Sequence, residues 1–239
     1  MAHHQHSPIA IVCFNRPNHL MKTLNALMEN PESIDSEVYF FVDKFKDLKD
    51  KELNQQTIKV CEMDWNFKKI NIVSNSHNKG LKLQIIDTAT YMAKKHKTFI
   101  ILEDDIIVSS KFLDYMNSSL SINEKTNIFH INGYNYSNII NNPSKAYTST
   151  LMFPWGWATW SDKWLSFIQS PDFDKDKITN STKKQIKKFN FYGLANYYYQ
   201  IDDNLSGKIS TWAIFWYQHI ILKNGLTLSP GKSHTLNIG

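Results

Sequence analysis

The chain has 239 residues, of which 42% are hydrophobic and 21% charged, values ordinary for a soluble globular protein that buries a sizeable core, whereas the 13% of aromatic residues is on the high side. Lysines and arginines outnumber acidic residues by 27 to 22, which gives a net charge of +5, yet Arg16 is the single arginine. Because nucleic-acid-binding proteins usually display clustered arginine on a basic face, we exclude nucleic acid as a partner.

The first 131 residues alternate between short apolar runs and amphipathic segments. Runs rich in β-branched and aromatic residues predict five strands, at residues 9–14, 38–42, 70–74, 98–102 and 127–131. Apolar residues at helical spacing predict four helices, at residues 20–28, 53–61, 85–93 and 113–120. Strand–helix alternation with fully apolar strands indicates an α/β fold, in which helices cover both faces of a parallel sheet.

The alternation ends after residue 131. Residues 132–150 predict a loop, and residues 152–164 are aromatic and irregular. Residues 183–200 predict a helix that carries the basic run KKQIKK, and residues 212–220 repeat apolar side chains at helical spacing, which predicts another helix. The basic run forms a solvated helix face or, as the alternative, contacts an anionic membrane.

We find no internal repeat and no linker rich in Pro, Gly or Ser, so we predict a single domain over residues 1–239. No apolar stretch approaches the ~20 residues that span a bilayer, and the start, MAHHQHSP, lacks the apolar core of a signal peptide. Cys13 and Cys61 fall in a predicted strand and a predicted helix, so we expect no structural disulfide. The sequence predicts a cytoplasmic protein, with peripheral contact at the inner face of the membrane as the open alternative.

Polar segments follow four of the predicted strands. In sheets of this type, ligands bind in the crevice beyond the carboxyl ends of the strands. The segments that reach this edge are NRPN (15–18), DKFKD (43–47), NSHNKG (75–80) and EDD (103–105). Their convergence on one edge predicts a nucleotide site.

Glu103, Asp104 and Asp105 directly follow the predicted strand 98–102. Neighbouring carboxylates repel one another, so a positive group is expected among them. Mn²⁺ or Mg²⁺ prefers carboxylate oxygen and shares its shell with water and substrate phosphates, so one or two protein carboxylates suffice. Because side chains alternate along a strand, Glu103 and Asp105 share a face and Asp104 points the other way. The alternative is a charged turn that merely ends the strand.

Ordered motifs extend over nearly the whole chain: PIAIVCFNRPNHLMKTLNAL, NKGLKLQI, IILEDDIIVSSKFLDYMNSSL, HINGY, WGWATWSDKW, STWAIFWY and KSHTLNIG. In these motifs the sequence resembles a bacterial group of soluble glycosyltransferases that have the GT-A fold and make polysaccharides. That group is distantly similar to N-acetylglucosaminyltransferase I. The resemblance implies a Rossmann-like, mostly parallel sheet flanked by helices, with a nucleotide-sugar-binding half (1–131) and an aromatic-rich, acceptor-side half (132–239).

The resemblance also implies an activity. The chain would move a sugar from a nucleotide-sugar donor, UDP-linked, to a glycan or lipid-linked acceptor in surface polysaccharide synthesis, with inversion at the sugar. By similarity, Asp105 would ligate Mn²⁺ or Mg²⁺ on the diphosphate, Asp104 would reach the ribose and Glu103 the donor sugar. Arg16 and Asp43 would contact the nucleotide.

Two further motifs carry implied site residues. In NKGLK, Asn78 and Gly80 would border the nucleotide sugar, because glycine permits close approach of the backbone. Lys82 of the same motif would neutralise a phosphate, with a solvated lysine as the alternative. His234 in KSHT is a candidate additional metal ligand, and its alternative is a loop histidine.

Tryptophan faces stack on the C–H surfaces of sugars, and the chain has two tryptophan-rich motifs. The residues predicted to contact the acceptor or the donor sugar are Trp155, Gly156, Trp157 and Trp212. The alternative is that these rings seal the core where the second half meets the sheet. We expect this core position for Trp160 and Trp164.

The sequence departs from the family at the general base. Relatives have an Asp before the Trp of STWAIFWY, where this chain has Ser210 and Thr211. Serine needs an activator to act as a base, and the nearest upstream acids are Asp202 and Asp203. Three interpretations stay open: one of these aspartates is the base, another acid or no strong base is used, or the chain binds a nucleotide sugar or glycan without transferring it. A nucleotidyltransferase would need a Gly-rich loop that CFNRPNHL lacks.

Overall fold

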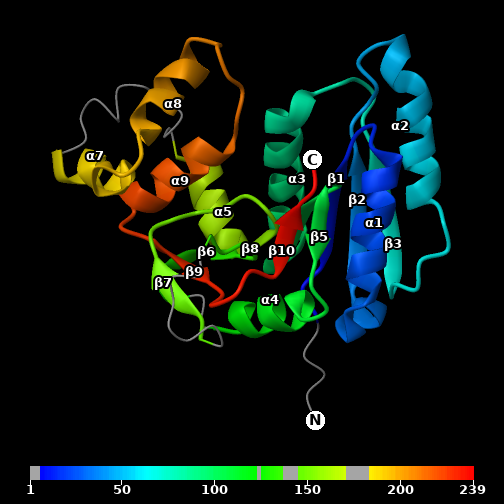
Figure 1. The fold of residues 1–239 in the computed structure, drawn as a ribbon, viewed down its shortest axis with the longest axis horizontal. Helices are drawn as coiled ribbons and strands as arrows, with labels where there is room; N and C mark the ends of the chain where they lie inside the picture. Colours follow the sequence, from blue (N-terminus) through cyan, green and yellow to red (C-terminus); the bar gives the residue numbers. More distant parts are fainter. Residues whose placement is uncertain (1–5, 123–124, 137–144, 171–182) are drawn as a thin grey trace.

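The computed structural model describes residues 6–122, 125–136, 145–170 and 183–239 (Figure 1). The strands are β1 (Ile9–Cys13), β2 (Glu37–Val42), β3 (Lys69–Ser74), β4 (Thr98–Glu103), β5 (Ile106–Val108), β6 (Ile128–Asn132), β7 (Tyr147–Ser149), β8 (Trp157–Trp160), β9 (Leu226–Ser229) and β10 (Thr235–Asn237). The α-helices are α1 (Pro17–Met28), α2 (Leu48–Cys61), α3 (Gly80–Lys95), α4 (Phe112–Leu120), α5 (Ser161–Ile168), α7 (Lys183–Phe189), α8 (Tyr197–Leu205) and α9 (Ala213–Leu222). Short 3₁₀ turns are η1 (Pro31–Asp35) and η2 (Phe191–Gly193).

The described strands form an eight-stranded sheet in the order β3-β2-β1-β4-β8-β6-β9-β7 and a separate β10–β5 ladder. β3, β2, β1 and β4 pair in parallel. β8 is antiparallel to both β4 and β6, β9 is parallel to β6, and β7 is antiparallel to β9. All strands of the large sheet except β8 and β7 therefore run in one direction. This confirms the predicted α/β class with a mostly parallel sheet, and strands from both halves of the sequence share that sheet.

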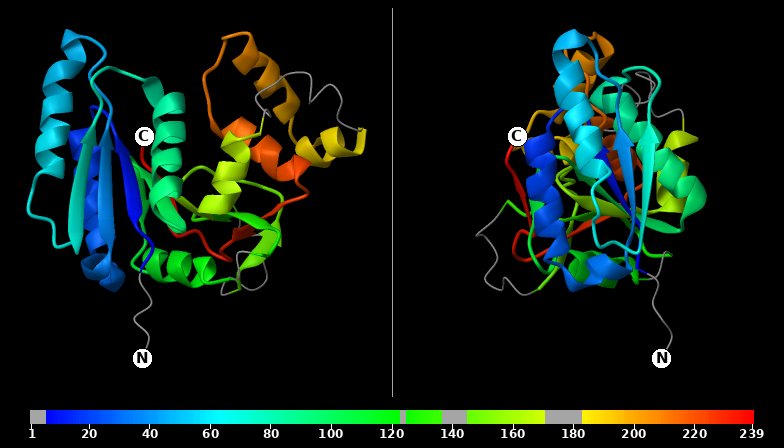
Figure 2. Two further views of the ribbon diagram at one scale, coloured as in Figure 1. Left: turned by 180° about the vertical axis from the view of Figure 1, so that it is seen from behind. Right: turned by 90° about the vertical axis from the view of Figure 1, so that its right-hand side faces the viewer.

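The pleat of the central strands divides the core into two layers. Ile9, Ile11 and Cys13 of β1 pack with α1, α2 and α4 on one face of the sheet. Ala10 and Val12 pack on the other face with α3, α5 and α9. Because successive side chains of a strand point to opposite faces, a fully apolar strand needs helices on both sides, and the two views of Figure 2 show them there.

The five predicted strands are confirmed as β1, β2, β3, β4 and β6, each within two residues at its ends. The expectation that residues 152–164 are irregular is wrong, because they contain β8 and the start of α5. β8 has four residues, too few for periodicity to be visible in the sequence. Cys13 and Cys61 are both free and buried.

The four predicted helices of the first half are confirmed as α1, α2, α3 and α4, and residues 212–220 fall almost entirely in α9. The single helix predicted over 183–200 is wrong. α7 ends at Phe189 and α8 begins at Tyr197, and between them Phe191 and Tyr192 have left-handed backbone, with φ of 48° and 57°. Among the described residues, no helix has both the length and the apolar character that crossing a bilayer requires.

Candidate functional site

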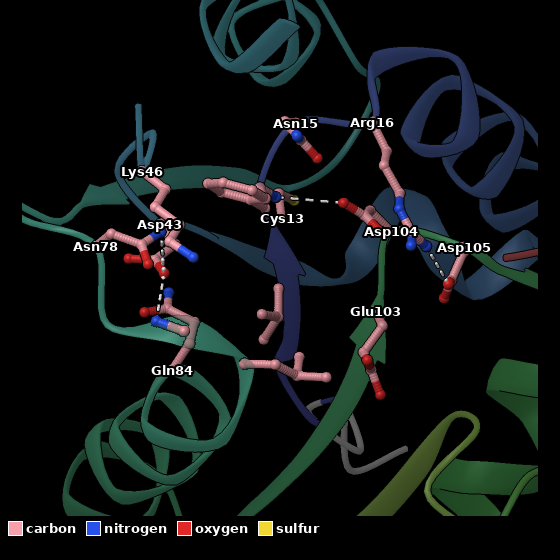
Figure 3. A pocket seen from close by; sticks show the side chains of 14 residues that line it. Cys13, Asn15, Arg16, Asp43, Lys46, Asn78, Gln84, Glu103, Asp104 and Asp105 are labelled. Carbon is pink, nitrogen blue, oxygen red and sulfur yellow. Dashed lines mark hydrogen bonds and ion pairs between the residues drawn. The ribbon is translucent and has the colours of Figure 1, made fainter. Parts of the chain in front are cut away.

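A cavity of about 440 Å³ lies at the carboxyl ends of β1, β2 and β4 (Figure 3). The polar segments that follow these strands, together with the start of α3, form its walls, as expected from the topology of a parallel sheet. The residues predicted from the sequence that line it are Arg16, Asp43, Asn78, Gly80, Glu103, Asp104 and Asp105. Asn15 and Lys46 also line it. Both lie in segments that the sequence singled out, although neither was named as a site residue.

The acidic triplet is held at the rim of the sheet by the strand that precedes it. Glu103 is the last residue of β4 and pairs with Val12 of β1. The Asp104 backbone N–H donates to the Val12 carbonyl at 3.0 Å, which carries the parallel ladder past the end of the strand. Thr23 of α1 donates its hydroxyl to the Asp104 carbonyl at 2.9 Å. The turn is therefore fixed to both β1 and α1.

The three carboxylates point in different directions (Figure 3). Asp104 accepts a hydrogen bond from the Phe14 backbone N–H at 3.2 Å and lies against the loop after β1. Asp105 Oδ2 accepts from Arg16 Nη1 at 2.7 Å. Asp105 Oδ1 is buried and has no hydrogen-bond partner in the described part of the chain. A buried carboxylate oxygen without a partner is costly, and a cation bound there would satisfy it.

The triplet carries more negative charge than its surroundings neutralise. Burial, reinforced by the charges of Asp105 and Asp104, raises the pKa of Glu103 to about 8. Burial and the charge of Asp105 likewise raise the pKa of Asp104 to about 7, against the opposing effects of the Phe14 hydrogen bond and Arg16. Near neutral pH these carboxyl groups are therefore partly protonated, and a bound cation would favour their ionised forms.

This donor set fits a divalent cation of the hard, oxygen-preferring kind. Asp105 offers an unpartnered carboxylate oxygen, and Glu103 and Asp104 add negative charge beside it. Across the described residues, no group of three or more His, Cys, Asp or Glu side chains is arranged to hold a metal ion by itself. Mg²⁺ and similar ions commonly take one or two carboxylates and complete their shell with water and phosphate oxygens. The site therefore suits an ion that arrives with a phosphorylated ligand.

Asp43 organises the opposite wall of the cavity. The residue is 4% exposed, and both of its carboxylate oxygens accept hydrogen bonds from the protein. The carboxylate accepts hydrogen bonds of 2.9–3.1 Å from the backbone N–H groups of Lys44, Lys79 and Gly80 and from the side-chain amides of Asn75 and Asn78. Gly80 begins α3 with a φ of 72°, in the left-handed region that glycine tolerates. Asp43 thus anchors the start of α3, and its contact with a nucleotide stays a prediction.

Lys82, predicted to meet a phosphate, does not line the cavity. Its Nζ lies over the ring of Phe215 of α9, 4.4 Å from the centroid. Burial lowers the pKa of Lys82. In this structure the lysine joins α3 to the second half of the chain.

His234 is not a ligand of an ion on Asp105 in this structure. The β10–β5 ladder places the His234 carbonyl opposite the Ser109 N–H, whereas Ile238 N–H pairs with the Asp105 carbonyl at the other end. The three residues of β5 lie between Asp105 and Ser109, and the four steps from Cα to Cα along this strand span about 13 Å. The His234 ring hydrogen-bonds to Ser109 Oγ at 2.8 Å and stacks on Tyr115. The alternative of a loop histidine therefore holds, since His234 lies just before β10.

Two of the predicted sugar-contacting tryptophans are core residues. Trp157 is 0% exposed and Trp212 is 3% exposed, and their rings stack with centroids 5.2 Å apart. A ligand cannot reach these faces, so this prediction is wrong and the core alternative applies. Trp160 and Trp164 are buried as expected.

Gly156 and Trp155 differ from these core rings. Gly156 has a φ of 71°, and a Cβ there would collide with Thr235, so its close approach is to the protein rather than to a ligand. Trp155 is half-buried and packs edge-on against Tyr134 with centroids 4.7 Å apart. Its contact with a sugar stays a prediction.

None of the candidate bases lines the cavity. Asp202 and Asp203 lie on α8, and Asp203 Oδ1 forms an ion pair with Lys208 at 3.1 Å. Ser210 is exposed in the segment between α8 and α9. The structure brings the acidic triplet and Arg16 together, but not the residues proposed for proton abstraction.

No protein-family model and no curated protein matches the sequence. Solved structures with partial similarity include TarS from S. aureus, at 14% identity over 46% of this chain and 19% of that chain, with a TM-score of 0.36. A cytidylyltransferase from Leptospira borgpetersenii is 12% identical over 69% of this chain and 64% of that chain, with a TM-score of 0.43.

The mannosyltransferase PcManGT from Pyrobaculum calidifontis, in complex with GDP-Man and Mn²⁺, is 10% identical over 54% of this chain and 36% of that chain, with a TM-score of 0.39. This chain spans less than two thirds of the length of each of these three proteins. With TM-scores of 0.36 to 0.43, the similarities define neither a family nor an activity for it.

Proposed function

We propose that this chain is a metal-dependent glycosyltransferase of the GT-A type. It would move a sugar from a nucleotide-sugar donor, UDP-linked, to a glycan or lipid-linked acceptor in surface polysaccharide synthesis. The observation that carries the proposal is the acidic triplet at the end of β4, which lines the cavity with Asp105 Oδ1 buried and unpartnered. The sequence motifs support the GT-A class, the inverting outcome and the distant similarity to N-acetylglucosaminyltransferase I.

The size and charge of the cavity suit a nucleoside diphosphate sugar. Its volume of about 440 Å³ lies within the range of small-molecule sites, roughly 300–1,000 Å³. Carboxylates line one wall, and Arg16 and Lys46 supply the positive charge that phosphates require. A divalent cation bound at Asp105 would stabilise the negative charge that develops on the departing nucleoside diphosphate.

Arg16 has two roles in this scheme. Its Nη1 donates to Asp105 Oδ2, while Asp105 Oδ1 has no hydrogen-bond partner among the described residues. The Arg16 side chain is 48% exposed, so its remaining N–H groups are accessible to a ligand. Guanidinium groups bind phosphate through two parallel hydrogen bonds, and Arg16 would therefore orient the diphosphate beside the acids that hold the cation.

A second function follows from the missing base. None of Asp202, Asp203 and Ser210 lines the cavity. Without a base beside the donor, the chain would bind a nucleotide sugar or glycan and not transfer it. Both functions use the same donor site. They differ in whether the sugar is transferred and the nucleoside diphosphate released. Only a transferase releases the nucleoside diphosphate faster when an acceptor is added.

A panel of nucleotide sugars tests both functions. Calorimetry with and without Mn²⁺ should detect metal-dependent binding of one donor, and prolonged incubation should show its slow hydrolysis. Asp105→Asn should abolish the metal-dependent part, whereas Asp64→Asn, at an exposed position outside the cavity, should leave it unchanged. Failure of the whole panel to bind in a metal-dependent manner would contradict the proposed function.

A further inference from the structure

The outer surface of α7 is positively charged. From residue 183 to residue 201 the sequence contains four lysines and no acidic residue. All four lysines belong to α7; three are exposed and one is half-buried. The other face of the helix packs inward, where Ile186 and Phe189 line a small apolar cavity against α9. The lysine face is therefore left to solvent.

Directly after α7 the backbone forms a strained turn. Phe191, Tyr192 and Gly193 have φ of 48°, 57° and 97°, and left-handed backbone is unfavourable for the two bulky residues. Asn190 holds the turn together. Its carbonyl accepts from Gly193 N–H at 3.0 Å, and its Oδ1 accepts from Tyr198 N–H at the start of α8 at 2.9 Å. The turn is thus a built feature with hydrogen bonds on both sides.

This turn presents two large apolar side chains to water. Tyr192 is 63% exposed and Leu194 is 81% exposed. Folding gains nothing from apolar surface that stays in water, so this turn combines a backbone cost with exposed apolar side chains beside the lysine face. α7 and α8 lie at the outer edge of the second half, on the side away from β1, β2 and β3 (Figure 1).

We propose that the four lysines of α7, with Tyr192 and Leu194, form a membrane-docking surface for bilayers rich in anionic phospholipid. Lysines are attracted by the negative surface potential of such bilayers, and tyrosine and leucine enter the headgroup region. Tyrosine is favoured at the interface between membrane and water. An acidic polymer would engage the lysines alone and would leave Leu194 without a role. Docking here does not depend on the chemistry proposed for the cavity.

Co-sedimentation of the full chain with vesicles tests the charged part of this surface. The chain should bind vesicles of equal parts phosphatidylglycerol and phosphatidylcholine, not phosphatidylcholine alone, and added salt should weaken binding. Lys187→Glu combined with Lys188→Glu should lower the partition coefficient by at least about tenfold. Lys22→Glu combined with Lys94→Glu makes the same charge change on exposed positions of α1 and α3 and should have little effect.

A second variant and its matched control test the apolar part of the docking surface. Leu194→Ser should lower the partition coefficient by at least about threefold. Leu48→Ser, at an 80% exposed position that begins α2, should leave it unchanged. The proposal is overturned if the wild type ignores anionic vesicles, or if the variants and their controls lose binding equally. It is also overturned if Leu194→Ser binds vesicles normally while heparin binding follows the lysines, which would indicate a site for polyanions.

Discussion

Replacing Glu103 by Gln should stabilise the protein when no divalent cation is present. Burial and the charges of Asp105 and Asp104 raise the pKa of Glu103 to about 8 from an ordinary value of 4.5. A carboxyl group with a raised folded pKa contributes stability that is fully present below its unfolded pKa and is lost as pH rises through the folded pKa. The wild type should therefore lose stability between about pH 4.5 and about pH 8, and the variant should lose less.

The magnitude follows from the two pKa values. At about pH 7, the fold keeps Glu103 mostly protonated whereas the unfolded chain ionises it, and this difference costs the fold about 3 kcal/mol. The side chain is half-buried and its surroundings relax, so we expect Glu103→Gln to gain about 2 kcal/mol at that pH and almost nothing near pH 4.5. In a chain of this length, that gain raises Tm by about 4–8 °C.

Urea unfolding in the presence of EDTA, followed by tryptophan fluorescence at about pH 5 and about pH 7.5, measures this difference. Glu62→Gln, at an exposed position after α2, is the matched control and should change stability at neither pH. If Glu103→Gln is no more stable than the wild type at the higher pH, the negative charge of the triplet is already neutralised by its surroundings and the reasoning is wrong. A gain that is the same at both pH values would refute the reasoning equally.

Three further predictions concern the supports of the site and the core. Asp43→Asn places an amide opposite the donors of Lys79 and Gly80 and should cost about 2–4 kcal/mol in urea unfolding; unchanged stability would contradict its role as an anchor. Burial lowers the pKa of His130 to about 3, so NMR should show a neutral ring at about pH 5, and stability should fall as pH drops below about 6.5. Trp157→Phe should lower Tm without altering donor affinity, since its ring is buried; a selective loss of affinity would argue for a ligand contact.

The sheet edge could be predicted because each central strand is a continuous apolar run followed at once by polar residues. The run before Glu103 fixes where β4 ends, and the rule that parallel strands share a carboxyl edge brings Arg16 and Asp105 together. These are local signals combined with one topological rule. They suffice for the acidic triplet and the loop after β1.

The failed predictions for His234 and for Trp157 and Trp212 depend on contacts between distant parts of the chain. The position of His234 is set by the register of β10 on β5, which no local pattern encodes. Trp157 and Trp212 are equally compatible with stacking on a sugar and with stacking on each other, and the pairing of β8 with β4 selects the second. The third failure is local: left-handed backbone at Phe191 and Tyr192 breaks the helix predicted over 183–200, and hydrogen bonds from Gly193 and Ala195 to the Asn190 carbonyl hold the turn.

The site at the end of β4 is tested most directly by anomalous diffraction from crystals of the full chain soaked with Mn²⁺ and UDP. A manganese peak within coordination distance of Asp105 Oδ1, with UDP phosphates beside it and Arg16 turned toward them, is the predicted result. A structure in which UDP binds elsewhere, or in which Asp105 keeps only its contact with Arg16 and gains no ion, would contradict it.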